Sequence, residues 1–368
     1  MKFNENNLDL IRLFAATQVA INHLYYHFGL QKEDLNLVVY EIIRVSQYFP
    51  GVPIFFMISG YLISRAYEKN PENKNYFRNR ILRLYPAAWM CLLVSLLFLG
   101  VTGNLNELNY KSFAIWLISE IIFIHIYSFT GFTEFGTGKL NGSLWTLPVE
   151  IQFYILIPIL YLILKKINFS KRTYDISVIT FLMILSFYYN LFIVQNNLLN
   201  LNDGIYKKIS IMLLPNYFYM FGLGILFQKN MDKIKDIIQD NGAYWLLFYV
   251  ITCEFLRYTK VNVEFGNNID FPMFILLSFT TLSLAYTKAE FSYNLIGKND
   301  ISYGVYIYHM PIANLMIELN LEMNYITYAI GITLTYLSGI LSWKLVERPF
   351  IKMKKKTINI NTTRKSNN

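Results

Sequence analysis

The chain has 368 residues, of which 54% are hydrophobic and only 15% are charged, and its mean hydropathy is +0.33. Apolar runs close to membrane-spanning length recur from end to end, which is typical of a polytopic membrane protein and excludes an ordinary soluble domain. The formal net charge of +9 would suit a nucleic-acid partner. However, the basic residues gather in short connections between the apolar runs, as the positive-inside rule describes. We therefore expect no nucleic-acid partner.

The apolar runs predict an all-α integral membrane protein with about ten transmembrane helices. We expect crossings near residues 8–28, 48–65, 84–101, 147–164, 176–194, 209–228, 243–258, 271–287, 301–318 and 325–345. The connections at 65–83 and 165–172 are strongly basic, which predicts that both lie in the cytoplasm together with both termini. This topology requires the stretch at 112–129, which contains Glu120 and His125, to be a re-entrant or interfacial segment rather than a full crossing.

We expect one membrane domain at 1–350 and a basic, polar, cytoplasmic tail at 351–368. The tail begins with the stretch "KMKKK" and continues with polar residues, so we expect it to be disordered and to contact anionic lipid. The two cysteines, Cys91 and Cys253, lie inside apolar runs without metal or redox spacing. They are expected to be packing residues.

The first apolar run, "LDLIRLFAATQVAINHLYYHF", places ionisable residues inside a membrane helix. Arg12 and His23 are separated by three helical turns plus about 20°, so they share one stripe and lie roughly 16 Å apart along the axis. Asp9 precedes Arg12 by three residues and can hold its guanidinium group. Such groups usually line a substrate path. The alternative is that Arg12 extends to the membrane surface and His23 joins a contact between helices.

The second apolar run and the basic connection after it carry the next candidates. In "PIFFMISGYLISRAY", the pair Ser59-Gly60 lies in mid-helix, where a glycine permits close approach of another helix. In "FRNRILRLYPAAW", Arg80 and Arg83 lie one turn apart at the expected cytoplasmic start of a helix. Two arginines on one face suit a phosphate group, which they bind bidentately. The alternative is ordinary positive-inside topology.

Two later stretches add polar and aromatic residues to the predicted site. In "NGSLWTLPVEIQFYILIPIL", Trp145 precedes Glu150, which lies in the first turn of a membrane helix. Glu150 either complements the helix dipole or is a buried carboxylate that orients a histidine or accepts a hydroxyl proton. In "ISYGVYIYHMPI", Tyr306 and His309 lie one turn apart. The glycine-rich stretch at 131–143 is expected to be a flexible loop outside the membrane, suited to gate an acceptor site.

Taken in order, these stretches resemble the acyltransferase-3 family of integral membrane acyltransferases, which includes bacterial O-antigen and capsule O-acetylases. The resemblance covers residues 8–350 and rests on Arg12, His23, "FFMISGYLI", "RILRLYP", "SLWTLPVEIQFY", "ISYGVYIYHMPI" and "ERPF". It implies a ten-helix core in the bacterial cytoplasmic membrane, a cytoplasmic acyl-CoA donor, and an extracytoplasmic or lipid-linked glycan acceptor. Some members carry an appended extracytoplasmic domain. We do not expect one here, which weakens a peptidoglycan-type assignment.

The residue patterns and the resemblance together predict roles for individual residues, and the resemblance itself implies those of His23, Arg12, Arg80, Arg83, Trp145 and Glu150. The predicted catalytic residues are His23, as general base or transient acyl carrier, with Glu150 or Asp9 orienting it. The predicted donor-binding residues are Arg12, Arg80 and Arg83. The predicted substrate-binding residues are Ser59, Trp145, Tyr306 and His309. Acetyl-CoA is expected as a co-substrate, with its pantetheine arm covering the roughly 16 Å from Arg12 to His23. No permanently bound cofactor is expected, and no metal, because the four histidines lack ligand spacing.

A transporter or flippase that moves an acyl or glycan group without forming a bond is the alternative function. Buried charges fit both ideas, but the sequence shows no inverted repeat and no paired broken helices of the kind found in transporters. Release of free CoA in the presence of acceptor would distinguish an enzyme. A succinyl or longer acyl donor stays open as an alternative to acetyl, as does the identity of the acceptor.

Overall fold

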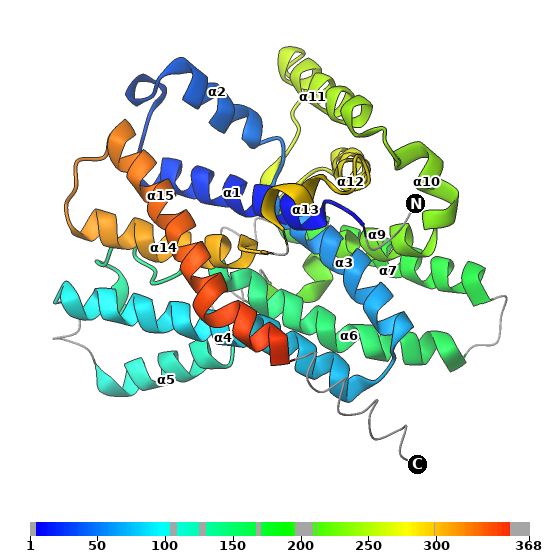
Figure 1. Ribbon diagram of the computed structural model, residues 1–368, viewed down its shortest axis with the longest axis horizontal. Coiled ribbons are helices and arrows are strands. Elements are labelled where there is room, and N and C mark those ends of the chain that lie inside the picture. The colour runs from blue at the N-terminus through cyan, green and yellow to red at the C-terminus, as the bar shows by residue number, and fades with distance from the viewer. Residues whose placement is uncertain are drawn as a thin grey trace.

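The computed structural model describes residues 5–103, 109–124, 130–166, 171–195, 209–210, 212–297 and 299–353, and throughout these ranges every regular element is a helix (Figure 1). The α-helices are α1 (Leu8–His27), α2 (Leu37–Ser46), α3 (Gly51–Lys69), α4 (Asn73–Val101), α5 (Tyr110–Ile121), α6 (Thr146–Lys166), α7 (Lys171–Gln195), α9 (Phe218–Lys229), α10 (Met231–Ile238), α11 (Gly242–Tyr258), α12 (Phe271–Ala285), α13 (Phe291–Ile296), α14 (Ser302–Glu318) and α15 (Tyr325–Ser342). Short 3₁₀ turns are η1 (Lys32–Asp34), η2 (Thr130–Phe132), η3 (Gly142–Trp145), η5 (Leu214–Asn216) and η6 (Gly266–Asn268), and η7 (Trp343–Glu347) is a π-helical turn. The predicted all-α class is confirmed for the described residues.

Within the described ranges, four helical segments are long and apolar enough to cross a membrane: Asn73–Val101, Gly142–Lys165, Arg172–Val194 and Tyr325–Met353. The pair α2 and α3 forms a fifth if it is taken as one span, bent by 43° at its break. Several helices on which the sequence predicted crossings are shorter, such as α11, with 17 residues, and α12, with 15. The chain thus has the helices of a membrane protein, whereas the number of ten spans and the cytoplasmic termini stay predictions.

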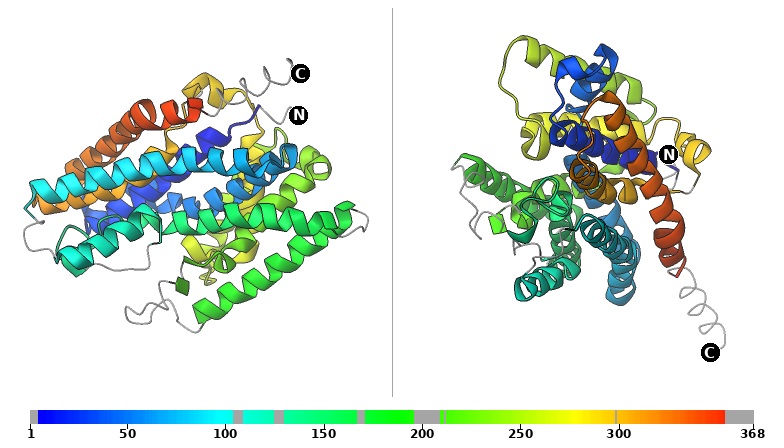
Figure 2. Two further views of the ribbon diagram at one scale, coloured as in Figure 1. Left: turned by 90° about the horizontal axis from the view of Figure 1, so that it is seen from below. Right: turned by 90° about the vertical axis from the view of Figure 1, so that its left-hand side faces the viewer.

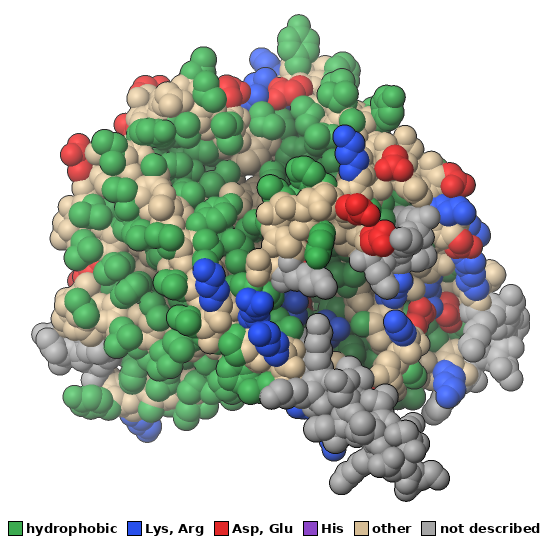
Figure 3. All heavy atoms as spheres, viewed as in Figure 1, with side chains coloured by type: hydrophobic (Ala, Val, Ile, Leu, Met, Phe, Trp, Pro, Cys, Tyr) green, Lys and Arg blue, Asp and Glu red, His purple; other side chains and the backbone are tan. Residues whose placement is uncertain are grey.

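The surface of the molecule agrees with a lipid environment. In Figure 3, hydrophobic side chains cover much of the left part of this face, over α4, α5 and α15, whereas charged side chains are most frequent toward the right, along the top and in a basic group near the centre. A surface so rich in exposed leucines and isoleucines is unfavourable in water but favourable against lipid. Examples are Leu97 on α4, Ile118 on α5 and Leu341 on α15.

Helices α1, α3 and α14 form the centre of the bundle, where α1 packs against both of the others and α14 also contacts α4 and α15 (Figures 1 and 2). On its other side, α3 packs closely against α9. This crossing depends on two glycines, since a Cβ atom on Gly60 would lie 2.0 Å from the Phe221 carbonyl oxygen and one on Gly224 would lie 2.1 Å from that of Met57. The predicted close approach at Gly60 is therefore confirmed.

Helix α5 forms part of the stretch for which a re-entrant or interfacial segment was predicted. Its 12 residues span about 18 Å, less than the roughly 30 Å of a bilayer core. It packs against α4 through a small separate core that includes Leu99, Trp116 and Phe132. Residues 125–129, and with them His125, lie outside the described residues, as does the tail from 354 onward. The membrane placement of 112–129 and the disorder of the tail thus stay predictions.

The loop between α5 and α6 is held on α14 rather than free. The side chain of Asn314 donates to the carbonyl oxygens of Lys139 and Leu140, at 2.8 and 2.9 Å, and its oxygen accepts from the backbone N–H of Thr137 at 2.9 Å. Gly136 has a φ of +53°, and a Cβ atom there would lie 2.6 Å from the Asn314 side-chain oxygen. The sequence predicted a flexible loop because it is rich in glycine, but here one glycine permits a tight backbone contact.

Candidate functional site

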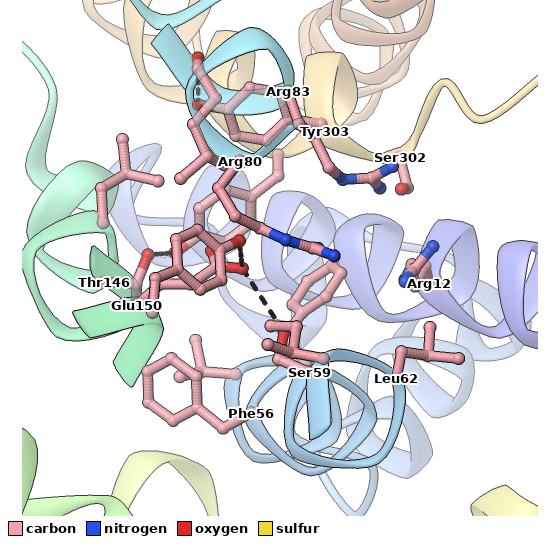
Figure 4. Close-up of a pocket in the computed structure, with 17 residues that line it drawn as sticks. Arg12, Phe56, Ser59, Leu62, Arg80, Arg83, Thr146, Glu150, Ser302 and Tyr303 are labelled. Atoms are coloured by element: carbon pink, nitrogen blue, oxygen red, sulfur yellow. Dashed lines mark hydrogen bonds between the residues drawn. The ribbon is translucent and has the colours of Figure 1, made fainter. Parts of the chain in front are cut away.

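A pocket between α1, α3, α4, α6 and α14 encloses about 750 Å³, counting its open mouth (Figure 4). Six of the predicted site residues line it: Arg12, Ser59, Arg80, Arg83, Glu150 and Tyr306. They come from five helices that are far apart in the sequence, so only the packing of the bundle brings them together. The remaining wall is largely aromatic and aliphatic, with Phe55, Phe56 and Leu62 among its residues.

Three arginines supply the positive charge of the pocket. Helix α4 carries Arg80 and Arg83, and α1 carries Arg12, and Figure 4 shows their guanidinium groups pointing toward the same space. Asp300 accepts a hydrogen bond from Arg83 at 2.7 Å and a longer one from Arg12 at 3.4 Å. Arg12 also donates to Asp9 at 3.0 Å, as the spacing in the first helix predicted. Asp300 is buried and serves as the shared counter-ion of two of the three arginines.

Asp300 is a site residue that the sequence analysis missed. It directly precedes α14, and the hydroxyl of Ser302 at the start of that helix also donates to it. The available signal was a single acidic residue placed just before an apolar run, and intramembrane ionisable residues usually have a function. What the sequence could not indicate is its pairing with α1 and α4, which lie more than 200 positions earlier in the chain.

Arg80 differs from the other two arginines because aromatic rings hold it instead of a carboxylate. Its guanidinium carbon lies 5.6 Å from the ring centre of Tyr76 and 5.5 Å from that of Tyr154. Its Nε atom is buried without a hydrogen-bond partner in the described part of the chain. Cation–π contacts stabilise a guanidinium group without using its N–H donors. Arg80 can therefore offer these donors to an anion in the pocket.

Glu150 lies on the wall of the same pocket. The hydroxyl of Tyr154, one turn later on α6, donates to its carboxylate, and the hydroxyl of Ser59 on α3 donates to it at 3.4 Å. A carboxylate held by two hydroxyl groups is partly desolvated and satisfied, as a buried acid must be. Glu150 and Ser59 thus form one polar patch on the wall of the pocket.

Tyr306 closes the pocket toward its inner end. Its hydroxyl donates to the carbonyl oxygen of Ser143 at 2.9 Å and lies 2.9 Å from the hydroxyl oxygen of Thr146. These contacts link α14 to the start of α6. Trp145, in contrast, does not line the pocket; its ring packs against Phe56 and Tyr217, with centroids 6.5 and 5.2 Å away. It supports the wall from behind.

His23 and His309 form a pair beyond Tyr306, outside the lining of the pocket. The Nδ1 atom of His23 lies 3.0 Å from the Nε2 atom of His309, and the His309 ring is 6.0 Å from the ring of Tyr306. His309 is 0% exposed, whereas His23 is partly exposed and contacts the exposed ring of His27 edge-on at 5.8 Å. The predicted histidine thus lies outside the arginine pocket, and His309 joins it to Tyr306 on the pocket wall.

The predicted orientation of His23 by a carboxylate is wrong. Among the described residues, the hydrogen-bond partner of His23 is His309, not Glu150 or Asp9. Asp9 is held by Arg12 near the start of α1, and Glu150 faces α3 across the pocket. Both carboxylates are therefore used elsewhere. Within the part of the chain that the structure describes, no group of three or more potential ligands is arranged to hold a metal ion.

These features define an all-helical protein of membrane type, with an arginine-lined pocket beside a pair of histidines. A sequence model of the acyltransferase-3 family, described as an acyltransferase domain, matches residues 5–344. The chain therefore belongs to this family and is an acyltransferase, which confirms the resemblance found in the sequence.

Individual relatives extend this finding. Nodulation protein 10 of Rhizobium leguminosarum bv. viciae is 28% identical over 95% of this chain and 94% of its own length. An O-acetyl transferase of Shigella phage Sf6 is also 28% identical, over 94% of this chain and 96% of its own. A peptidoglycan O-acetyltransferase of Listeria monocytogenes is 24% identical over 83% of this chain but only 51% of its own length. No solved structure matches the chain with significance.

Proposed function

We propose that this protein transfers an acetyl group from acetyl-CoA to a hydroxyl group of a glycan at the bacterial cytoplasmic membrane. The observation that carries the proposal is the convergence of Arg12, Arg80 and Arg83 on one pocket, in a chain whose relatives include proteins named as O-acetyltransferases. Acetyl-CoA carries phosphate groups at one end and a thioester at the other. An arginine cluster suits the former, because guanidinium groups bind phosphate oxygens bidentately.

In this proposal the donor enters from the cytoplasm and its anionic head contacts Arg80, which pairs with no carboxylate among the residues that the structure describes. Arg12 and Arg83, fixed by Asp300, add positive potential around the same space. The acetyl end then approaches His23 past Tyr306, so the contacts of the Tyr306 hydroxyl with Thr146 and Ser143 must open during turnover. The acceptor glycan, extracytoplasmic or lipid-linked, approaches from the partly exposed side of His23.

The chemical step needs one base. His23 takes the proton of the acceptor hydroxyl while the oxygen of that hydroxyl attacks the thioester carbonyl carbon. The carbon–sulfur bond breaks, CoA leaves as a thiolate, and the proton held on His23 neutralises it. Direct transfer of this kind balances without a further reactant. An acetyl group carried briefly on the His23 ring is the alternative route, with the same net reaction.

The decisive experiment compares membranes that contain wild type or His23→Ala at matched expression. Labelled acetyl-CoA is supplied with envelope glycan of the host, and label in the glycan and release of free CoA are both measured. We expect both signals from wild type alone. Labelling by both proteins would refute the role of His23. No labelling and no CoA release by wild type would refute the proposed donor and acceptor.

A further inference from the structure

The histidine pair restricts where protons can lie on the two rings. The Nδ1 atom of His309 lies 2.6 Å from the backbone carbonyl oxygen of Tyr306. A carbonyl oxygen only accepts hydrogen bonds, so Nδ1 of His309 must carry a hydrogen atom. His309 is also 0% exposed, and among the described residues no carboxylate hydrogen-bonds to it. A buried imidazole without a counter-ion is neutral, because an unpaired buried charge is far costlier than the neutral ring.

It follows that the Nε2 atom of His309 carries a lone pair and accepts. Its partner 3.0 Å away is Nδ1 of His23, which must therefore donate. A neutral His23 that has its hydrogen on Nδ1 has its lone pair on Nε2. That nitrogen is not used in the contact with His309. The chain of two hydrogen bonds, from His23 through His309 to the Tyr306 carbonyl, thus leaves the Nε2 atom of His23 with a lone pair and, among the described residues, without a hydrogen-bond partner.

The sequence analysis placed His309 among the residues that bind substrate, but its geometry does not permit this. Both of its ring nitrogens are engaged within the protein, and the side chain is fully buried. Helix α14 holds the ring rigidly, since the carbonyl that fixes it belongs to the residue one turn earlier on the same helix. A ring so placed can act on the acceptor only through His23.

We propose that His309 is a positioning residue, which holds His23 in the tautomer whose Nε2 atom accepts the proton of the acceptor hydroxyl. The same hydrogen bond persists after proton transfer, because Nδ1 of His23 still donates to His309 when the His23 ring is charged. This stabilises the charged ring as it forms. The inference rests on the proposed function for the identity of the reaction, but the tautomer itself follows from the two hydrogen bonds and from the neutrality of the buried His309 ring.

The kinetic test uses His309→Leu and His309→Gln. Leucine removes the acceptor, so we expect kcat to fall at least tenfold, since a general base contributes about 10²–10⁴-fold. The KM values for acetyl-CoA and for glycan should change less than about twofold. Glutamine has a side-chain oxygen that can accept from His23, so it should recover most of the lost kcat. His27→Gln is the matched control, because His27 contacts His23 only ring to ring, and we expect near wild-type kinetics.

Different results would overturn the proposal. A rise in the glycan KM with unchanged kcat would make His309 an acceptor contact. Equal loss in the leucine and glutamine variants, or full activity in both, would remove the need for a fixed hydrogen-bond acceptor. Acetyl-CoA affinity and the unfolding temperature are measured on each variant, so that a misfolded protein is recognised. If His309→Leu does not fold, the kcat of His309→Gln decides whether a hydrogen-bond acceptor at this position is sufficient.

A spectroscopic test separates this inference from the proposed function. Nitrogen-15 NMR of histidine-labelled wild-type protein in lipid reports which ring nitrogen is protonated, whether or not the right substrate is known. The chain has four histidines, so the signals of the His23 ring are assigned as those that disappear in His23→Ala. We expect His23 protonated at Nδ1 in wild type and a mixture of tautomers in His309→Leu. His23 protonated at Nε2 in wild type would refute the proposal, even if the protein acetylates glycan.

Discussion

At the scale of single residues, the three arginines that line the pocket have different environments. Asp300 neutralises Arg83 and, at a longer distance, Arg12, whereas Arg80 is stacked between tyrosine rings. A buried carboxylate that already holds two guanidinium groups competes with any anionic ligand for them. The affinity for a phosphate-bearing donor should therefore depend most on Arg80, and the stability of the fold most on Asp300.

We expect Arg80→Gln to raise the KM for acetyl-CoA about tenfold or more, with little change in the unfolding temperature. A hydrogen bond to a charged group contributes about 1.5–3 kcal/mol, and no ion pair within the described protein is lost with Arg80. Initial rates over a range of acetyl-CoA concentrations provide the measurement. Lys74→Gln removes the same charge from an exposed position on the same helix and should leave the KM unchanged. Equal KM values in the two variants would contradict the role of Arg80.

Asp300→Asn should lower the free energy of unfolding by roughly 2 kcal/mol. Removing one partner of a fully buried ion pair costs about 3–5 kcal/mol, and the loss is smaller here because the Arg83 side chain is 28% exposed. Denaturant or thermal unfolding in detergent measures the difference. Asp9→Asn is the matched comparison, since the Asp9 side chain is 50% exposed and shares only Arg12. If the two variants were equally stable, Asp300 would not be the central counter-ion.

At the scale of elements, α14 connects the parts of the site. Tyr306 faces the pocket, His309 contacts α1, and Asn314 holds the loop before α6. These residues lie along one helix, so a rigid α14 fixes the distance between the pocket, the histidine pair and the loop. The loop is thereby part of the framework around the histidines, rather than the freely moving gate that its glycine content suggested.

Asn314→Ala should release this loop without unfolding the bundle. The change removes the hydrogen bonds to Thr137, Lys139 and Leu140, so amide exchange of the loop should accelerate at least tenfold, since local opening no longer breaks them. Hydrogen–deuterium exchange with mass spectrometry measures the effect. Asn320→Gly is the control, because the exposed Asn320 side chain donates, among the described residues, only to the nearby Glu318 carbonyl, and glycine keeps the left-handed backbone at φ +52°. Unchanged exchange in Asn314→Ala would mean that other contacts hold the loop.

At the scale of the whole molecule, the arginine pocket and the histidine pair lie at different depths along the axis of α1. The arginine pocket lies near the start of α1 and the histidines near its end, roughly 16 Å further along the axis. If the basic connections are cytoplasmic, as the positive-inside rule predicts, the pocket opens toward the cytoplasm and the histidine pair lies nearer the outer surface. This is the arrangement that transfer from a cytoplasmic donor to an outer acceptor requires.

Single cysteines test this orientation. Both native cysteines, Cys91 and Cys253, are buried. We expect a cysteine introduced at Asn70, between α3 and α4, to resist a membrane-impermeant maleimide in intact cells and to react after permeabilisation. A cysteine at Glu134, in the loop before α6, should react in intact cells, because this loop is predicted to lie outside the cell. Both positions are exposed, so they differ in the side of the membrane on which they are predicted to lie. The reverse pattern would invert the topology and contradict a cytoplasmic donor.

The part of the site that was predictable from the sequence is local. Helical periodicity places Asp9 beside Arg12 and puts Arg80 one turn from Arg83, and a glycine in mid-helix marks a close crossing at Gly60. Apolar composition likewise determines the helical, membrane-type character of the chain. Each of these inferences uses residues that are neighbours along one helix, where geometry follows from spacing alone.

The tertiary structure alone decided which helix faces which. The contacts of Asp300 with α1 and α4, and of His309 with His23, join residues more than 200 positions apart, and no spacing rule relates such pairs. For the same reason the sequence offered Glu150 or Asp9 as the partner of His23, whereas the structure pairs it with His309. A helix determines its own faces by periodicity, but its partner is chosen by packing over the whole bundle, and that choice gives each charged side chain its counter-ion and each ring its orientation.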